Sequence, residues 1–196
     1  MLVEVRKAKR AGGKVPKKVI NRYKKPYILK ALKEMYGPYC CYCEQRVTTV
    51  GFQHIEHRMP KAPDKFPERT FEWDNLHLAC ERCNNEKSNK WDATNAILDA
   101  VTDVPIAQHL SYELYFRRPV TARGRTTYEH TNLDRDPDSG LLYARGEVWK
   151  RAMTLIEQIV RDRGAPAVST VRNQLLRMCK DEFGSMMRHL MDIHGI

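Results

Sequence analysis

Two pairs of cysteines in this sequence have the spacing of metal ligands. Cys40 and Cys43 form one C-x-x-C pair, and Cys80 and Cys83 form a second pair after 36 intervening residues. Two residues between cysteines allow both thiolates to turn toward one point, and four thiolates fill the tetrahedral shell of a structural zinc ion. The sequence therefore predicts a structural Zn²⁺ site, with a sizeable segment held between the two pairs.

The other two cysteines are expected to stay outside this site. Cys41 lies within a tight knuckle, which should point it away from the metal. Cys179 stands beside Met178 on a helical face, where a buried apolar role is typical. Free thiols without function remain an alternative for all six, but chance rarely places two such pairs in one chain.

Acidic, imidazole and amide side chains lie between and just after the cysteine pairs. Glu56 precedes His57, Asn75 follows at a distance, and Asn84 comes directly after Cys83. A carboxylate and an amide carbonyl are oxygen ligands that suit Mg²⁺, and they leave most of its shell to water and phosphate. A neutral histidine can take a proton from an attacking water at pH 7. This set indicates metal-assisted phosphodiester hydrolysis.

These residues stand in four short motifs whose order and spacing resemble a known family. The motifs are Cys-Tyr-Cys-Glu from Cys41, Ile-Glu-His-x-x-Pro-Lys from Ile55, Trp-Asp-Asn-Leu from Trp73 and Ala-Cys-x-x-Cys-Asn-x-x-Lys from Ala79. They resemble the HNH (ββα-metal) endonucleases with two C-x-x-C knuckles. More narrowly, they resemble the PtuB nucleases of retron and Septu-type antiphage systems. The resemblance covers residues 40–91, about a quarter of the chain.

The resemblance implies a role for each residue of the set. His57 would be the general base, and Glu56 and Asn84 would hold a catalytic Mg²⁺ or Mn²⁺. Asn75 would bond the His57 ring and fix its tautomer, a positioning role that such a base requires. The last position of the motif is Asn84 here, where the family has His or Asn. The zinc would take no part in the chemistry, because four thiolates leave it no open position.

Several other side chains in this segment are assigned structural roles. His54 and His77 compete with His57, but a single histidine near a metal site is more often a structural group. Tyr42 and Trp73 are expected to pack the small core against the zinc, since so compact a module has few other apolar groups.

Local patterns predict the elements that position these residues. Apolar residues at helical spacing predict a helix over 26–36, which Gly37 and Pro38 end. Between residues 47 and 91, short segments with turn residues indicate a small β-hairpin, a loop and then a short helix.

The positive charge of the chain is concentrated at one end. Lys and Arg number 34 against 24 Asp and Glu, and the whole excess of +10 falls within the first 30 residues. A mobile or partner-ordered basic arm over residues 1–25 would attract phosphates; a solvated tail or a contact for an acidic protein are alternatives. Lys87 could contact a phosphate, or it could face solvent or pair with Glu86. The nucleic-acid contacts that we expect are Lys17, Lys18, Arg22, Lys24, Lys25 and Lys87.

Residues 92–196 have the composition of a helical domain. Apolar stripes at helical spacing mark core faces, and residues 117–140 indicate an irregular or strand-containing connection. This region could dock a partner or could only stabilise the small nuclease module. The stripes are Trp149, Met153, Ile156 and Val160, and then Val168, Val171, Leu175, Met178, Met186 and Leu190.

The sequence also indicates the cellular compartment in which we expect the protein. No stretch approaches the roughly 20 apolar residues of a membrane-spanning helix, and no apolar run follows the basic start as in a signal peptide. We therefore expect a cytoplasmic protein without a membrane partner. In that compartment a disulfide framework is not expected, because the cytosol keeps thiols reduced.

Together these patterns predict an α+β, mainly helical chain. It would comprise a basic arm (1–25), a zinc-clamped HNH nuclease module (26–91) and a helical C-terminal region (92–196). The expected activity is metal-dependent DNA cleavage. The resemblance further implies a PtuA-like ABC-type ATPase partner and, in some systems, a retron reverse transcriptase with its RNA-linked DNA. The alternatives are a zinc-stabilised nucleic-acid-binding module without catalysis and a stand-alone restriction-type HNH nuclease.

Overall fold

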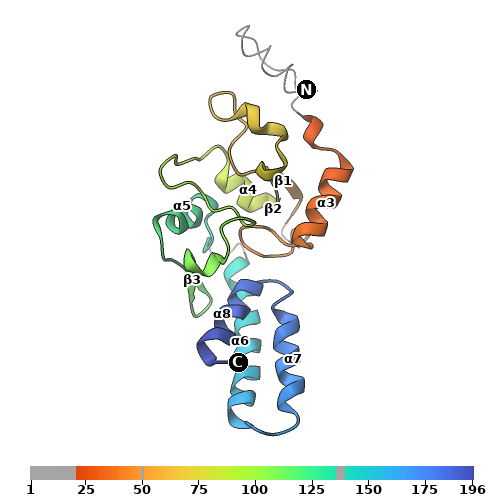
Figure 1. Cartoon of the computed structure of the whole chain (residues 1–196), viewed down its shortest axis with the longest axis vertical. Coiled ribbons are helices and arrows are strands. Elements are labelled where there is room, and N and C mark those ends of the chain that lie inside the picture. Colours follow the sequence, from red (N-terminus) through yellow and green to blue (C-terminus); the bar gives the residue numbers. More distant parts are fainter. Residues whose placement is uncertain (1–20, 50, 136–139) are drawn as a thin grey trace.

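The computed structural model of the chain describes residues 21–49, 51–135 and 140–196. Lys17 and Lys18, which we expect to contact nucleic acid, lie outside the described residues. Figure 1 shows an upper part, built from short strands and helices, above a bundle of helices. None of the described helices combines the length and the apolar character needed to cross a membrane.

Helix α3 (Pro26–Tyr36) confirms the helix predicted from the apolar spacing. Proline fits its first turn, where the missing N–H costs no helical hydrogen bond. Gly37 ends it with a φ of 63°, a conformation that glycine adopts without strain. Leu32 is fully buried on the face that packs against β2 (Leu76–Cys80). The helix therefore holds the residues that precede it, including the 3₁₀ turn η1 (Asn21–Tyr23), beside the strand pair.

Two strands and one helix form the centre of the upper part. β1 (Gln53–His57) pairs antiparallel with β2, so that His57 lies opposite Leu76, and α4 (Glu81–Lys87) follows β2 directly. The sequence predicted a hairpin followed by a loop. In the structure the loop, residues 58–75, lies between the strands and carries the 3₁₀ turns η2 (Pro67–Phe71) and η3 (Trp73–Asn75).

The first cysteine pair lies in a knuckle that docks onto β2. Within the knuckle the Cys40 N–H donates to the carbonyl of Gln45, and the Cys41 N–H donates to the carbonyl of Leu78. Tyr42 is buried as expected, but Trp73 is 46% exposed and does not pack the core. The reason is that Trp73 lies in the loop between the strands, on the turn η3.

Residues 92–135 wrap the ββα centre with a second small sheet and a helix. η4 (Ile106–Gln108) precedes the antiparallel strands β3 (Leu110–Glu113) and β4 (Phe116–Pro119), and α5 (Ala122–Thr131) packs against α4. The strand content that we predicted for 117–140 is present in β4. Helix α5 was missed because its threonines and charged residues give no apolar stripe.

The C-terminal bundle consists of α6 (Leu141–Arg161), α7 (Val168–Met178) and α8 (Gly184–His194). The two predicted apolar stripes lie in these helices, although the second stripe spans α7 and α8. The break between α7 and α8 ends at Phe183, which is fully buried with a φ of 58°. Val160 is 44% exposed and is not part of the core.

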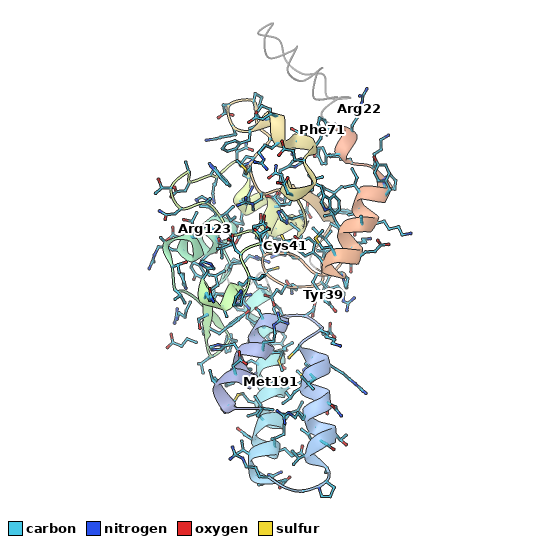
Figure 2. All side chains as sticks on the ribbon, in the orientation of Figure 1. Arg22, Tyr39, Cys41, Phe71, Arg123 and Met191 are labelled. Atoms are coloured by element: carbon cyan, nitrogen blue, oxygen red, sulfur yellow. The ribbon has the colours of Figure 1, made fainter. Side chains whose placement is uncertain are left out.

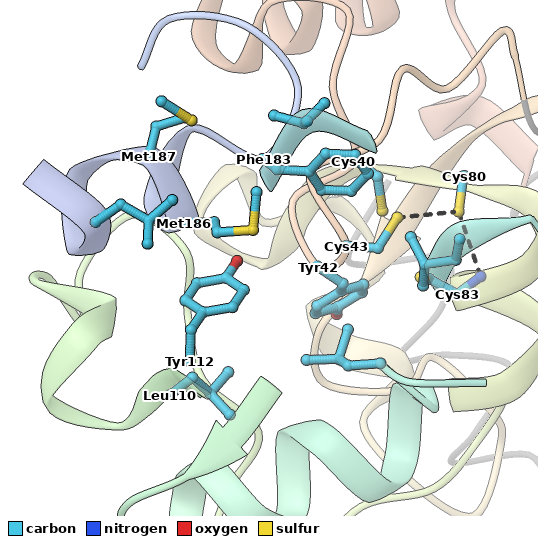
Figure 3. Packing of buried hydrophobic residues seen from close by; sticks show 14 of the residues in the cluster. Cys40, Tyr42, Cys43, Cys80, Cys83, Leu110, Tyr112, Phe183, Met186 and Met187 are labelled. Carbon is cyan, nitrogen blue, oxygen red and sulfur yellow. Dashed lines mark hydrogen bonds between the residues drawn. The ribbon is translucent and has the colours of Figure 1, made fainter. Parts of the chain in front are cut away.

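The Glu44 carboxylate, next to the first knuckle, links β4 to the start of α8. Glu44 Oε1 accepts from Arg117 Nη2 at 2.8 Å, and Glu44 Oε2 accepts from the Ser185 N–H, also at 2.8 Å. Figure 3 shows Phe183 near Cys40, and Met186 belongs to the same buried cluster. The start of α8 therefore lies beside the first knuckle.

Candidate active site and zinc centre

The four cysteines of the two pairs come together as the sequence predicts. Their sulfurs all lie within 4.8 Å of one another in the buried core, and Cys43 Sγ lies 3.9 Å from Cys80 Sγ (Figure 3). Zinc–sulfur bonds of about 2.3 Å in a tetrahedron require sulfur–sulfur distances of about 3.8 Å. The donor set and its spacing therefore fit Zn²⁺. Cys41 is not part of the group, also as expected.

His57 is held at the end of β1 in one tautomer. Its Nε2 lies 3.0 Å from the carbonyl oxygen of Thr70, in the loop between the strands. A carbonyl can only accept, so Nε2 carries the proton and Nδ1 keeps its lone pair. Burial of the ring and the nearby charge of Lys61 lower the pKa of His57 to about 3. The imidazole is therefore neutral at pH 7, and its free lone pair lies at Nδ1.

Asn75 does not bond the His57 ring, contrary to our expectation. Its Oδ1 accepts from the Met59 N–H at 2.7 Å, and its Nδ2 donates to the carbonyls of Met59 and Arg69 at 3.0 and 3.1 Å. The amide thus ties together both ends of the loop that carries Thr70. Asn75 positions the imidazole indirectly, because the carbonyl that fixes the ring belongs to this loop.

Glu56 and Lys87 form a buried ion pair behind the histidine. Lys87 Nζ lies 2.6 Å from Glu56 Oε1 and also donates to the His57 carbonyl at 2.8 Å. The Tyr42 hydroxyl donates to the same Oε1 at 3.3 Å. Burial raises the pKa of Glu56, and the charge of Lys87 opposes that rise. The Lys87 side chain has no exposed surface, so it is not the nucleic-acid contact that we expected, nor is it paired with Glu86.

Asn84 lies on α4, where its amide faces β1. Its Nδ2 lies 3.3 Å from His54 Nδ1. A polar pocket of about 450 Å³ collects Glu56, His57 and Asn84, together with Lys61, at the junction of β1 and α4. Three of the four predicted site residues therefore line one cavity, and Asn75 supports it from the loop.

Comparison with known proteins agrees with this geometry. Residues 40–90 match the family model of the HNH endonucleases. Residues 40–90 are an HNH endonuclease domain. The chain is also 31% identical over 140 residues to the Septu protein PtuB of Bacillus thuringiensis. That match covers 69% of this chain and 51% of the relative, so the chain spans about half the length of that protein. Because the matched stretch is longer than the HNH domain, the similarity extends beyond it.

Three of the basic residues that precede the HNH domain, Arg22, Lys24 and Lys25, lie at the edge of the upper part of the molecule. Lys24 and Lys25 line a hollow of about 750 Å³ between the start of α3 and β1. Arg22 is exposed and lies at the outer edge of the upper part (Figure 2). His77, the other competing histidine, is buried and bonds the Tyr36 hydroxyl through Nδ1, away from the pocket residues.

Four residues around the HNH site were not assigned a role from the sequence. Thr70 acts through its backbone carbonyl, which no side-chain pattern reveals. The ring of Tyr23 meets His57 edge to face at 4.5 Å, and Lys61 Nζ lies 3.5 Å from His57 Nδ1. Arg135 donates to Cys83 Sγ at 3.4 Å and brings positive charge to the thiolate cluster. Only Lys61 could have been found, because it ends the Ile-Glu-His-x-x-Pro-Lys motif.

Proposed function

We propose that this protein hydrolyses phosphodiester bonds in DNA with the help of Mg²⁺ or Mn²⁺. The observation that carries the proposal is the placement of His57. Its Nδ1 is unprotonated, its orientation is fixed by the Thr70 carbonyl, and it lines the same pocket as a carboxylate and a carboxamide. A neutral imidazole beside oxygen ligands is what water activation at a metal-bound phosphate requires.

Glu56 and Asn84 would hold the metal ion. The contacts of the Glu56 carboxylate with Lys87 and Tyr42 both use Oε1, so we assign Oε2 to the cation. The Asn84 amide uses Nδ2 toward His54, which leaves Oδ1 as its ligand atom. When bound, the ion neutralises the charge that develops on the phosphate and the leaving oxygen.

The remaining residues of the pocket orient and support the base. His57 Nδ1 accepts a proton from the attacking water, and the resulting imidazolium is stabilised by its Nε2–H bond to the Thr70 carbonyl. Lys61, whose ammonium lies beside Nδ1, is placed to bind a phosphate oxygen of the substrate. The zinc centre serves as a staple that lets so small a module keep this geometry.

Substitution of His57 tests the activity directly. His57→Ala should lower Mg²⁺-dependent nicking of supercoiled plasmid at least ~100-fold, the lower end of what a general base contributes. His77→Ala is the matched control, because His77 is equally buried and lies on the paired strand. Retention of cutting by His57→Ala, with the control also active, would remove His57 as the base.

One observation favours a second candidate, a zinc-stabilised nucleic-acid-binding module without catalysis. The ion pair with Lys87 gives Glu56 a structural partner, as a core carboxylate without a metal would have. The two candidates differ in the effect of divalent metal on plasmid DNA. Binding without nicking at any Mg²⁺ or Mn²⁺ concentration would favour the second candidate.

We further propose that the nuclease is the effector of a Septu-type antiphage system in the cytoplasm. The similarity to the Septu protein PtuB supports this assignment. Its partner would be a PtuA-like ABC-type ATPase, and in a retron-type system a reverse transcriptase with RNA-linked DNA would join them. Co-purification with a co-expressed PtuA-like ATPase tests the proposal. A nuclease that cuts fully without that ATPase would instead be a stand-alone restriction-type enzyme.

A further inference from the structure

A second hollow adjoins the catalytic pocket. It lies between the start of α3 and strand β1, has a volume of about 750 Å³, and shares Lys61 and Asn84 with the catalytic pocket. Its size is within the range of specific ligand sites. Because two residues line both cavities, an extended ligand in this hollow would run directly to the position of the reacting phosphate.

The charge of this hollow is suited to a polyanion. Lys24, Lys25 and Lys61 line it, and Glu81 is the one acidic side chain among the described residues of its lining. Lys61 and Lys24 also lie over the ring of Tyr23, with their Nζ atoms 5.2 and 5.9 Å from its centroid. These contacts place two ammonium groups beside the Tyr23 ring, which lines the same hollow.

Aromatic side chains accompany the lysines. Phe52 immediately precedes β1, lines the hollow and is 76% exposed. It is the most exposed of the large apolar side chains in the described part of the chain, so its ring is free to stack on a ligand in the hollow. Tyr23, buried beside His57, forms the floor at the catalytic end. Sites for single-stranded nucleic acid usually combine a row of cationic side chains, which bind the phosphates, with an aromatic ring, which stacks on a base.

We propose that this hollow, which we name the strand groove (Tyr23, Lys24, Lys25, Phe52 and Lys61), binds an unpaired DNA strand that flanks the scissile phosphate. Phe52 stacks on a base, and the lysines bind the phosphates on either side of it. An unpaired strand is required because the bases of a duplex already stack on both faces. The inference rests on the proposed nuclease function and adds a preference for single-stranded or locally opened DNA.

Binding to labelled DNA tests the strand groove without relying on cleavage. The full-length, zinc-loaded protein is titrated against a fluorescein-labelled single-stranded oligodeoxynucleotide, and against the same strand annealed to its complement, without added Mg²⁺. Phe52→Ala should weaken single-strand binding by about 5-fold to 150-fold, the range that one base–aromatic stack contributes. Duplex binding should not change. Tyr143→Ala, which truncates a similarly exposed aromatic ring on α6, is the matched control and should change neither.

The lysines are tested through the salt dependence of single-strand binding. Replacement of Lys24 and Lys25 together by Ala should reduce the slope of log affinity against log salt by about 1.4, or about 0.7 for each phosphate that is no longer neutralised. Lys150→Ala on α6 is the control for a surface lysine outside the groove. An unchanged slope in the double variant would overturn the binding of phosphates by these lysines.

The outcomes separate this inference from the proposed function. If the wild-type chain binds and nicks DNA but Phe52→Ala binds single strands as the wild type does, the strand groove is refuted and the nuclease stands. Equal losses on single strands and duplex would also refute it, and would make Phe52 a wedge in duplex DNA. If the wild-type chain neither binds nor cuts DNA, the proposed function itself fails.

Discussion

Replacing Lys87 by Met should destabilise the protein strongly, although the residue lies outside the reaction. Its ammonium is fully buried, 2.6 Å from the buried carboxylate of Glu56, and it also holds the His57 carbonyl. Removing one partner of such a pair leaves an uncompensated charge, which costs about 3–5 kcal/mol of unfolding free energy. For a chain of this size that corresponds to a fall in melting temperature of roughly 6–20 °C.

Thermal unfolding of the zinc-loaded variants, followed by circular dichroism, measures this cost. Lys150→Met is the matched control, because its ion pair with Glu147 has a similar distance of 2.8 Å but is exposed on α6. An exposed helical pair of that kind contributes little to stability, because solvent screens the two charges.

A second substitution in the pair checks the physical reason. Glu56→Gln combined with Lys87→Met removes both charges, so the double variant should be more stable than Lys87→Met alone. The reasoning is refuted if Lys87→Met costs no more than Lys150→Met. It is also refuted if the loss of unfolding free energy in the double variant equals the sum of the losses in Glu56→Gln and Lys87→Met.

Three further predictions concern the supports of the site. Asn75→Ala should cost roughly 2–3 kcal/mol, because it removes three hydrogen bonds to the loop backbone. Hydrogen exchange should rise across residues 58–75, and unchanged exchange there would contradict the role of Asn75. Cys80→Ser, or removal of zinc by a strong chelator, should unfold the HNH domain; unaltered near-UV circular dichroism after verified zinc loss would show that the metal is not a staple. Arg135→Met should accelerate zinc release to a chromogenic chelator, because the guanidinium donates to Cys83 Sγ, whereas the exposed Arg172→Met should not. Equal release rates would place Arg135 outside the zinc centre.

The parts of the structure that follow from local pattern were predictable. Helix α3 has an apolar stripe between a proline start and a glycine end, and the sequence predicts its bounds. The convergence of the four cysteines was predictable because the C-x-x-C spacing is a property of the chain itself. The α+β fold class and the HNH domain are confirmed by the structure and the family match.

Features that depend on distant contacts were not predictable. The prediction that Asn75 bonds the His57 ring was wrong, because a short motif shows which residues are present but not which atoms form hydrogen bonds in the fold. Its amide bonds the loop backbone, and a backbone carbonyl, that of Thr70, fixes the imidazole instead. Lys87 looked like a surface cation because charge alone does not report burial. Its placement depends on the partner carboxylate 31 positions earlier, which only the folded chain brings near.

Helix α5 was missed for the converse reason. Thr121 caps its N-terminus, and the Thr121 hydroxyl accepts from the Gly124 N–H. The buried residues of α5 are mostly threonines, whose hydroxyls donate to backbone carbonyls one turn earlier. Gly124 is required because a Cβ there would meet the His109 carbonyl oxygen at 1.9 Å. Neither feature produces an apolar periodicity, so the pattern that identified α3 and α6 does not identify α5.

The central claim is that Glu56, His57 and Asn84 converge on one catalytic cation. Anomalous diffraction from crystals of the zinc-loaded protein soaked in Mn²⁺ tests it most directly. We predict a manganese peak within about 2.2 Å of Glu56 Oε2 and Asn84 Oδ1, on the side of the pocket that His57 Nδ1 faces. A fully occupied manganese ion elsewhere in the chain, with none between these two oxygens, would contradict the claim.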